Sequence, residues 1–199
     1  DGHRYCNVHL GATVIPAVLA VAEYENLEWG DLLRGVVIGY EAAIRLGRAI
    51  QPSHKNLGFH VSGTCGTIGA AMGISAALKF SKAQMKDAIS SAVANASGIL
   101  EVIEDDSELK PYNIGRASLD GLTAAYVARA GIKGPNDVVG GKRGFFALMS
   151  ETNDPSSLNR DPKGVYGIEM IYRKPYAACR HCHAPIEAAI NLKEKHNIQ

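Results

Sequence analysis

The sequence predicts a mainly α-helical domain over residues 1–163 and the beginning of a smaller α+β domain over residues 164–199. Three observations support this. Apolar side chains recur at helical spacing up to about residue 150, small residues replace bulky ones along several of these stretches, and loop-forming residues then give way to a β-prone segment. Because 46% of the 199 residues are hydrophobic, the chain can bury a substantial core.

Apolar spacing predicts the first two helices. Residues 12–25 form an apolar segment with Pro16 near its start, where a helix tolerates proline. Residues 31–50 carry an apolar face that returns every three or four positions. That face consists of Leu32, Leu33, Val36, Val37, Tyr40, Ile44 and Leu46. Both segments should therefore be buried along at least one side.

Small residues dominate the next three predicted helices. Residues 65–79 form the first of them. Ser81 and Gln84 then stand in capping-box spacing and open a second helix over residues 82–97. After an acidic break, a third helix covers residues 114–130 and ends before a glycine. Small side chains at intervals of three and four residues let such helices pack closely.

Beyond Ser150 the sequence predicts loops, a strand and a further helix. Residues 152–157 and 161–164 are rich in Asn, Asp, Pro, Ser and Gly, which indicates loops. Residues 165–172 alternate roughly and favour a short strand, while residues 183–196 carry apolar positions at helical spacing. We therefore expect a domain boundary in this region.

Composition and charge exclude several classes of protein. The formal net charge is +1, with 21 Lys and Arg against 20 Asp and Glu, so no basic face points to nucleic acid or an anionic membrane. The longest apolar runs are shorter than the ~20 residues of a membrane-spanning helix, and no signal peptide is recognised. Four cysteines give no disulfide framework of the secreted kind. We expect a soluble, cytoplasmic protein with reduced thiols and small-molecule partners.

The most informative motif is GFHVSGTCG at residues 58–66, which contains His60. Glycines let the backbone bend tightly, the N-terminus of the following helix offers free N–H groups, and an imidazole moves protons near neutral pH. The motif therefore indicates a carboxylate or phosphate site with an acid/base group. A capped turn whose histidine packs against the next helix is the alternative.

Two further segments carry candidate functional side chains. His9 lies before a glycine and the first apolar helix, so it repeats the placement of His60. Lys110 precedes Pro111 and the third small-residue helix, where its ammonium group could neutralise a substrate carboxylate. A polar loop and a solvated surface lysine are the respective alternatives.

The string CRHCH at residues 179–183 matches the pattern for covalent haem attachment. We reject a haem site because that attachment follows export, and because the preceding helical core is unlike a haem-wrapping domain. Its two cysteines and two histidines lie too close together to reach one tetrahedral zinc ion, and no second Cys/His pair follows nearby. A thiol or metal module stays open as an alternative function.

Taken in order along the chain, the motifs resemble the MmgE/PrpD family, which includes 2-methylcitrate dehydratase, cis-aconitate decarboxylase and iminodisuccinate epimerase. The matching strings are HLGA at 9–12, GYE at 39–41 with RL at 45–46, GFH at 58–60, KP at 110–111 with IGRA at 114–117, GFF at 144–146 and KPY at 174–176. They cover nearly the whole chain. The resemblance implies a helical first domain, an α+β second domain, a homodimer and an active site in the cleft between the domains.

The resemblance also implies catalytic roles. His60 and His9 correspond to the family's proton-transferring histidines, and Lys110 corresponds to the lysine that binds a carboxylate. An ammonium ion and imidazole N–H groups aimed at that carboxylate stabilise the enediolate that forms when a neighbouring proton is removed. The family's chemistry requires no metal or organic cofactor.

Three more residues are expected to contact the substrate on the same grounds. Asp1 corresponds to the end of the family's acidic motif. Cys179 stands where the decarboxylase branch has a histidine, and His181 lies close by in the sequence. The cysteine at this position argues against decarboxylase activity.

We therefore predict a lyase of the 2-methylcitrate dehydratase type, which eliminates a group after proton abstraction next to a carboxylate of a small di- or tricarboxylic acid. An epimerase or isomerase of a dicarboxylate is one alternative. A non-catalytic fragment of the same fold is another.

Overall fold

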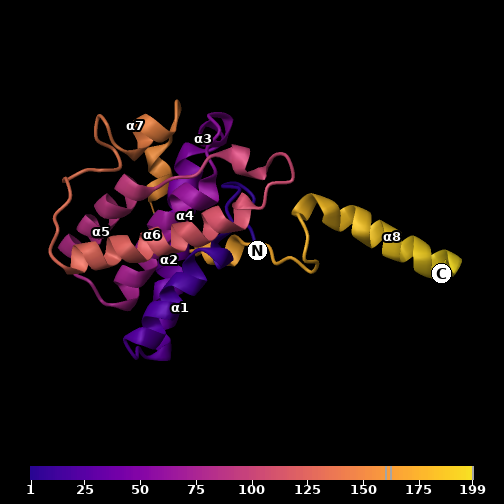
Figure 1. Ribbon diagram of the computed structural model, residues 1–199, viewed down its shortest axis with the longest axis horizontal. Coiled ribbons are helices and arrows are strands. Elements are labelled where there is room, and N and C mark those ends of the chain that lie inside the picture. The colour runs from indigo at the N-terminus through magenta and orange to yellow at the C-terminus, as the bar shows by residue number, and fades with distance from the viewer. Residues whose placement is uncertain (160, 162, 199) are drawn as a thin grey trace.

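The computed structural model describes residues 1–159, 161 and 163–198, which form a helical body with one helix projecting from it (Figure 1). Within these residues the α-helices are α1 (Val14–Tyr24), α2 (Trp29–Ile50), α3 (Ser53–Asn56), α4 (Val61–Ala77), α5 (Lys82–Asn95), α6 (Leu109–Arg129), α7 (Phe145–Met149) and α8 (His183–His196). The short 3-10 helices are η1 (Leu10–Ala12), η2 (Leu100–Ile103), η3 (Pro155–Leu158), η4 (Gly167–Met170) and η5 (Arg180–Cys182). The chain is thus mainly α-helical, as predicted.

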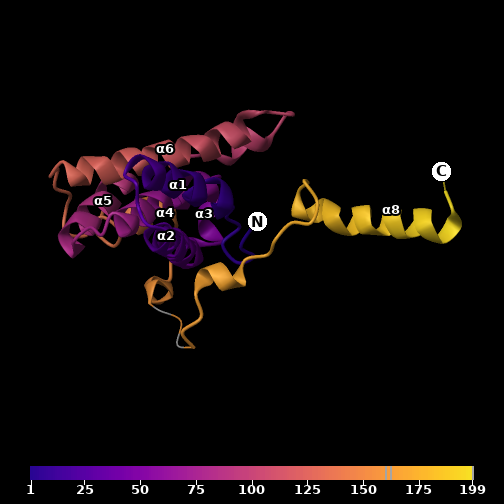
Figure 2. The same ribbon diagram turned by 90° about the horizontal axis from the view of Figure 1, so that it is seen from below.

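Helix α4 forms the centre of the helical body. All of its residues except Met72 are buried. Helices α1, α2, α5 and α6 contact it, and Figure 2 shows α2 and α6 on opposite sides of it. Most residues of α4 are Gly, Ala, Ser or Thr, so its neighbours can approach from several directions. A helix buried all round needs no single apolar stripe.

Helices α2 and α4 approach each other so closely that their backbones touch. A Cβ atom added to Gly39 would lie 2.7 Å from the carbonyl oxygen of Gly69, and one added to Gly69 would lie 2.8 Å from that of Gly39. Gly35 and Gly73 repeat this reciprocal arrangement one turn away, at 2.8 Å in both directions. Any larger residue at these four positions would push the two helices apart.

The helices predicted from apolar and small-residue spacing are confirmed. Ser81 caps α5, and both hydrogen bonds of the capping box with Gln84 are present. Gly131 follows α6 with φ of +90°, a conformation that glycine adopts at little cost. The helix predicted over residues 183–196 has those bounds in the structure.

Helix α2 begins two residues earlier than predicted, and helices α4 and α6 begin four and five residues earlier. Helix α4 begins at Val61, so His60 itself is its N-cap residue. Helix α6 begins at Leu109, so Lys110 lies inside the first turn instead of before it. Pro111 fits there because the first turn of a helix has no internal partner for its N–H groups.

The strand predicted over residues 165–172 is wrong. The segment contains η4 and packs against α2, where the backbone N–H of Gly167 donates to the buried carboxylate of Glu41. Gly2 and Tyr172 exchange two backbone hydrogen bonds of 3.2 and 3.0 Å, which tie the end of the segment to the N-terminus. Apart from this single antiparallel bridge, the segment pairs with no strand among the described residues, and it packs against a helix instead.

The C-terminal part of the chain differs from the helical body. Helix α8 projects away from the body in both views, and most of its residues are exposed (Figures 1 and 2). Pro162, in the loop predicted over residues 161–164, lies outside the described residues. The division into domains at 163/164 stays a prediction. Within the described part of the chain, none of the helices combines the length and the apolar character that crossing a bilayer requires.

The contact between α2 and α4 leads to a stability prediction. Gly39→Ala places a methyl group against a carbonyl oxygen, and we expect it to lower the free energy of unfolding by about 1–3 kcal/mol. Gly30→Ala, in the same helix with nothing within 4 Å of the added carbon, should leave stability equal or slightly higher. Urea unfolding followed by circular dichroism compares the two variants. Equal stability of both would contradict the backbone contact.

Candidate active site

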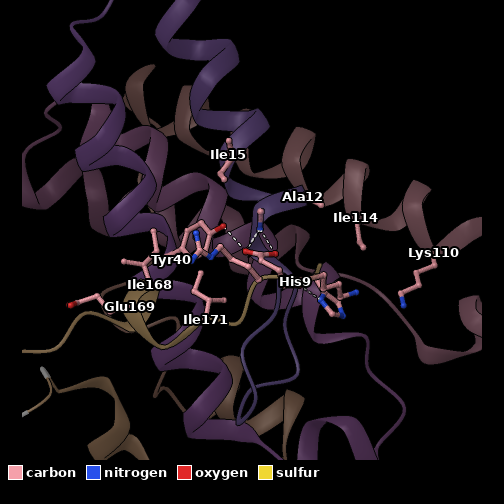
Figure 3. A pocket seen from close by; sticks show the side chains of 13 residues that line it. His9, Ala12, Ile15, Tyr40, Lys110, Ile114, Ile168, Glu169 and Ile171 are labelled. Carbon is pink, nitrogen blue, oxygen red and sulfur yellow. Dashed lines mark hydrogen bonds between the residues drawn. The ribbon is translucent and has the colours of Figure 1, made fainter. Parts of the chain in front are cut away.

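A cavity of about 890 Å³ lies where the N-terminal segment, α2, α6 and the segment after η4 meet. Its polar lining consists of Asp1, His9, Tyr40, Lys110, Glu169, Arg173 and Lys174. Figure 3 shows His9 from the N-terminal segment, Tyr40 from α2 and Lys110 from α6 around this space. A smaller cavity of about 200 Å³ is lined by His60 and His181, and again by His9 and Lys110. The two cavities therefore share an imidazole and an ammonium group.

His9 is held in place by two hydrogen bonds. Its Nδ1–H donates to the backbone carbonyl of Asp1 at 2.8 Å, and its backbone N–H donates to the hydroxyl of Ser62 at 3.1 Å. Burial, together with the positive charges of Lys174 and Lys110, lowers the pKa of His9 to about 4. The imidazole is therefore neutral at pH 7, and its Nε2 atom is available to accept a proton.

Asp1 lies at the edge of the large cavity, and its carboxylate already has partners. The backbone N–H of Gly11 donates to both carboxylate oxygens, at 3.1 and 3.0 Å. The hydroxyl of Tyr40 donates to one of them at 2.8 Å. Burial raises the pKa of Tyr40 to about 12, so this hydroxyl stays a donor. Asp1 thus fixes the turn that carries His9.

His60 forms the junction between α4 and α6. The side chain is 5% exposed, and its backbone N–H donates to the carbonyl of Gly98 at 3.0 Å. Its Nδ1 atom lies 2.6 Å from Oδ1 of Asn113 on α6. Burial lowers the pKa of His60 and nearby Lys110 lowers it further, whereas the Asn113 hydrogen bond raises it. The net direction is downward, which favours the neutral imidazole.

Lys110 extends from the first turn of α6 toward His9 (Figure 3). It lines both cavities, and its charge lowers the pKa of both His9 and His60. The structure therefore brings the three predicted catalytic residues, His9, His60 and Lys110, to adjoining cavities although they are about 50 residues apart in sequence.

Arg173 and Lys174 add positive charge to the large cavity, and neither was a candidate from the sequence. The backbone pairing of Gly2 with Tyr172 places both residues beside the N-terminal segment. The KPY string that contains Lys174 was the available signal. With Lys110, these residues give the cavity three cationic side chains, which suits a ligand with more than one carboxylate.

The cysteine motif is only partly connected to the site. His181 lines the smaller cavity with His60, as its predicted role requires. Cys179 is exposed and lines a separate depression beside Tyr176, so the structure does not place it with the other candidates. Cys182 is also a free, exposed thiol. Among the described residues, no three His, Cys, Asp or Glu side chains are arranged to hold a metal ion.

The site combines cations with neutral bases. Ammonium and guanidinium groups can bind carboxylates through charge-assisted hydrogen bonds. A neutral imidazole beside them can accept a proton from a carbon next to a bound carboxylate. The arrangement therefore suits removal of a proton from a small polycarboxylic acid.

Comparison with known proteins identifies the family of the chain. Residues 1–158 match the MmgE/PrpD N-terminal domain. The chain is 25% identical over 209 residues to cis-aconitate decarboxylase of Aspergillus terreus, covering 98% of this chain and 42% of that protein. It is 29% identical over 147 residues to cis-aconitate decarboxylase of Homo sapiens, covering 71% of this chain and 30% of that protein. The chain thus spans less than half the length of these relatives. Because the domain match covers most of the sequence, the chain belongs to the MmgE/PrpD family.

Proposed function

We propose that the protein is a lyase that acts on a small di- or tricarboxylic acid, by the proton abstraction and elimination of a 2-methylcitrate dehydratase. One observation carries the proposal: neutral His9 and His60 adjoin the same ammonium group, Lys110, at two neighbouring cavities. The expected cytoplasmic location and the homodimer belong to this proposal as well.

The chain's own residues account for each step of such a reaction. Lys110 and Lys174 bind substrate carboxylates and oppose the negative charge that builds up as a proton leaves the neighbouring carbon. The Nε2 atom of His60 or His9 accepts that proton, and the imidazolium returns it to the hydroxyl group on the adjacent carbon, which leaves as water. A carbon–carbon double bond forms, and no oxidant or reductant is needed.

Decarboxylation of cis-aconitate is the second candidate function. It is favoured by the relatives from Aspergillus terreus and Homo sapiens, which are cis-aconitate decarboxylases. The same cations would bind the substrate, but the carbon–carbon bond to one carboxylate breaks, carbon dioxide leaves, and a proton from an imidazolium or from water is added to the carbon skeleton in its place. An epimerase that returns the proton to the opposite face of the carbon needs the same base and the same cations.

The first prediction concerns the cationic and basic residues. Lys110→Ala should lower kcat/KM by about 100- to 1000-fold because a preorganised charge opposite the forming enediolate is lost. His60→Ala should lower it by about 100- to 10,000-fold through loss of proton transfer. Turnover of the full-length protein with its polycarboxylate substrate is the measurement, and circular dichroism checks that the variants fold.

Matched controls lie far from the cavities. Lys82→Ala on α5 and His196→Ala at the end of α8 remove the same groups from exposed positions, and both should retain full activity. Near-normal rates in Lys110→Ala and His60→Ala would refute the assignment.

The second prediction concerns pH. Because burial and neighbouring cations lower the pKa values of His9 and His60, the base stays neutral below the ordinary histidine pKa of 6.5. We expect the midpoint of the acidic limb of kcat/KM to lie below pH 6.5. The pH–rate profile, corrected for ionisation of the substrate, measures this. A midpoint above pH 6.5 would contradict a histidine base whose pKa is lowered by burial and neighbouring cations.

The third prediction separates the reaction outcomes. The full-length protein is incubated with 2-methylcitrate, cis-aconitate, or D- or L-iminodisuccinate, and the products are identified by NMR. Loss of water from 2-methylcitrate supports the dehydratase, release of carbon dioxide supports the decarboxylase, and inversion at one carbon supports the epimerase. Binding of these acids without turnover would show a non-catalytic protein.

A further inference from the structure

Asn113 is the residue that contacts His60 most directly, although sequence reasoning gave it no role. It lies on α6 three positions after Lys110, so both side chains leave the same face of the helix. Its Oδ1 atom is 2.6 Å from Nδ1 of His60 on the neighbouring helix end. The same turn of α6 therefore supplies an ammonium group and a hydrogen-bond partner for the imidazole.

The amide of Asn113 sits in a space that exists only because two glycines surround it. A Cβ atom on Gly63, in the first turn of α4, would lie 2.5 Å from Oδ1 of Asn113. A Cβ atom on Gly98 would lie 2.9 Å from Oδ1 and 3.2 Å from Nδ2. Gly98 has φ of +144° and its carbonyl accepts the backbone N–H of His60. The amide and the imidazole are thus positioned by the same short stretches of chain.

This contact determines where the neutral imidazole carries its proton. An amide Oδ1 can only accept a hydrogen bond, so Nδ1 of His60 must carry the hydrogen. In the neutral ring the lone pair is then on Nε2. No described residue hydrogen-bonds that atom, and the ring lines the smaller cavity. His9 shows the same pattern, because its Nδ1–H donates to the carbonyl of Asp1.

We propose that Asn113 is a positioning residue that holds His60 in the Nδ1–H tautomer, so that Nε2 is the atom that exchanges protons with the substrate. The exchange of protons between Nε2 and a substrate rests on the proposed function, whereas the tautomer of His60 does not. Asn113 acts through His60 and touches no reacting atom.

Other charged groups face His60 and have to be considered with it. The smaller cavity brings Lys110 from α6, Lys55 from α3, His9 from the N-terminal segment and His181 from η5. These groups are cationic or neutral. Asn113 is the one that hydrogen-bonds the ring, and its contribution to the pKa of His60 opposes that of burial and Lys110.

The first test detects the tautomer without any turnover. Two-dimensional NMR correlating ring carbon-bound protons with ring nitrogens, on ¹⁵N-histidine-labelled full-length protein at pH 7.5, distinguishes a protonated Nδ1 from a protonated Nε2. His60→Gln identifies the His60 signals by their loss. We expect a protonated Nδ1 in the wild-type protein and a mixture of tautomers in Asn113→Ala. A protonated Nε2 in the wild type would overturn the inference.

The second test uses the pH profile. Asn113→Ala removes the hydrogen-bond acceptor of His60, so kcat/KM should fall by about 10- to 100-fold, which is less than the effect of losing the whole imidazole. Because that hydrogen bond raises the pKa of His60, the acidic limb should also move to lower pH. Asn113→Asp keeps an acceptor and adds a negative charge, so the limb should move to higher pH. Asn95→Ala, at the exposed last residue of α5, is the control and should change neither kcat/KM nor the position of the acidic limb.

The outcomes separate the two proposals. Shifts of the acidic limb in opposite directions in Asn113→Ala and Asn113→Asp support the positioning role. A general loosening of the fold would not shift the limb in opposite directions in the two variants. An unmoved limb in both folded variants overturns it. If the tautomer is as expected but no polycarboxylate is turned over, the proposed function fails while the positioning of His60 by Asn113 stands.

Discussion

The contact between the backbones of α2 and α4 is the constraint on which the rest of the structure depends. Gly35 and Gly39 face Gly73 and Gly69 so closely that no side chain fits between the helices. Tyr40 follows directly in α2 and supplies the hydroxyl that holds Asp1, while α4 begins at the cap residue His60. The distance between the two helices therefore determines how far the N-terminal segment lies from the imidazole. A wider spacing would separate the two cavities.

Helix α6 packs against the other side of α4 equally closely. A Cβ atom on Gly121 would lie 2.6 Å from the carbonyl oxygen of Thr67, so α6 also packs almost directly on the backbone of α4. A rigid helix that is fixed at Gly121 has its first turn fixed as well, and that turn carries Lys110 and Asn113. Close helix packing thus sets the geometry of the site, although none of the packing glycines touches it. Small residues in this fold therefore act on the candidate site through the positions of the helices.

Sequence reasoning could predict the helices and part of the site, for reasons that particular residues make clear. Helical periodicity and the Ser81 cap are local signals, so they were readable. The strand predicted over residues 165–172 was wrong. Alternation of apolar and polar residues indicates which side chains are buried, but it does not show that this segment packs on α2 and hydrogen-bonds the carboxylate of Glu41. Asn113 and the charge of Lys174 were missed because their importance comes from contacts across more than 50 residues. The placement of Cys179 outside the cavities likewise depends on the path of the chain after η4.

The charged side chains of the candidate site link carboxylate binding to the basicity of His9. Burial and the charges of Lys174 and Lys110 lower the pKa of His9, so its imidazole is a weak base. A carboxylate bound to those ammonium groups would add negative charge beside the ring, and opposite charge raises the pKa of an imidazole. In the proposed reaction the histidine would therefore gain basicity when the substrate arrives. The cations proposed to bind the substrate would then also keep the base unprotonated until the proton to be removed is present.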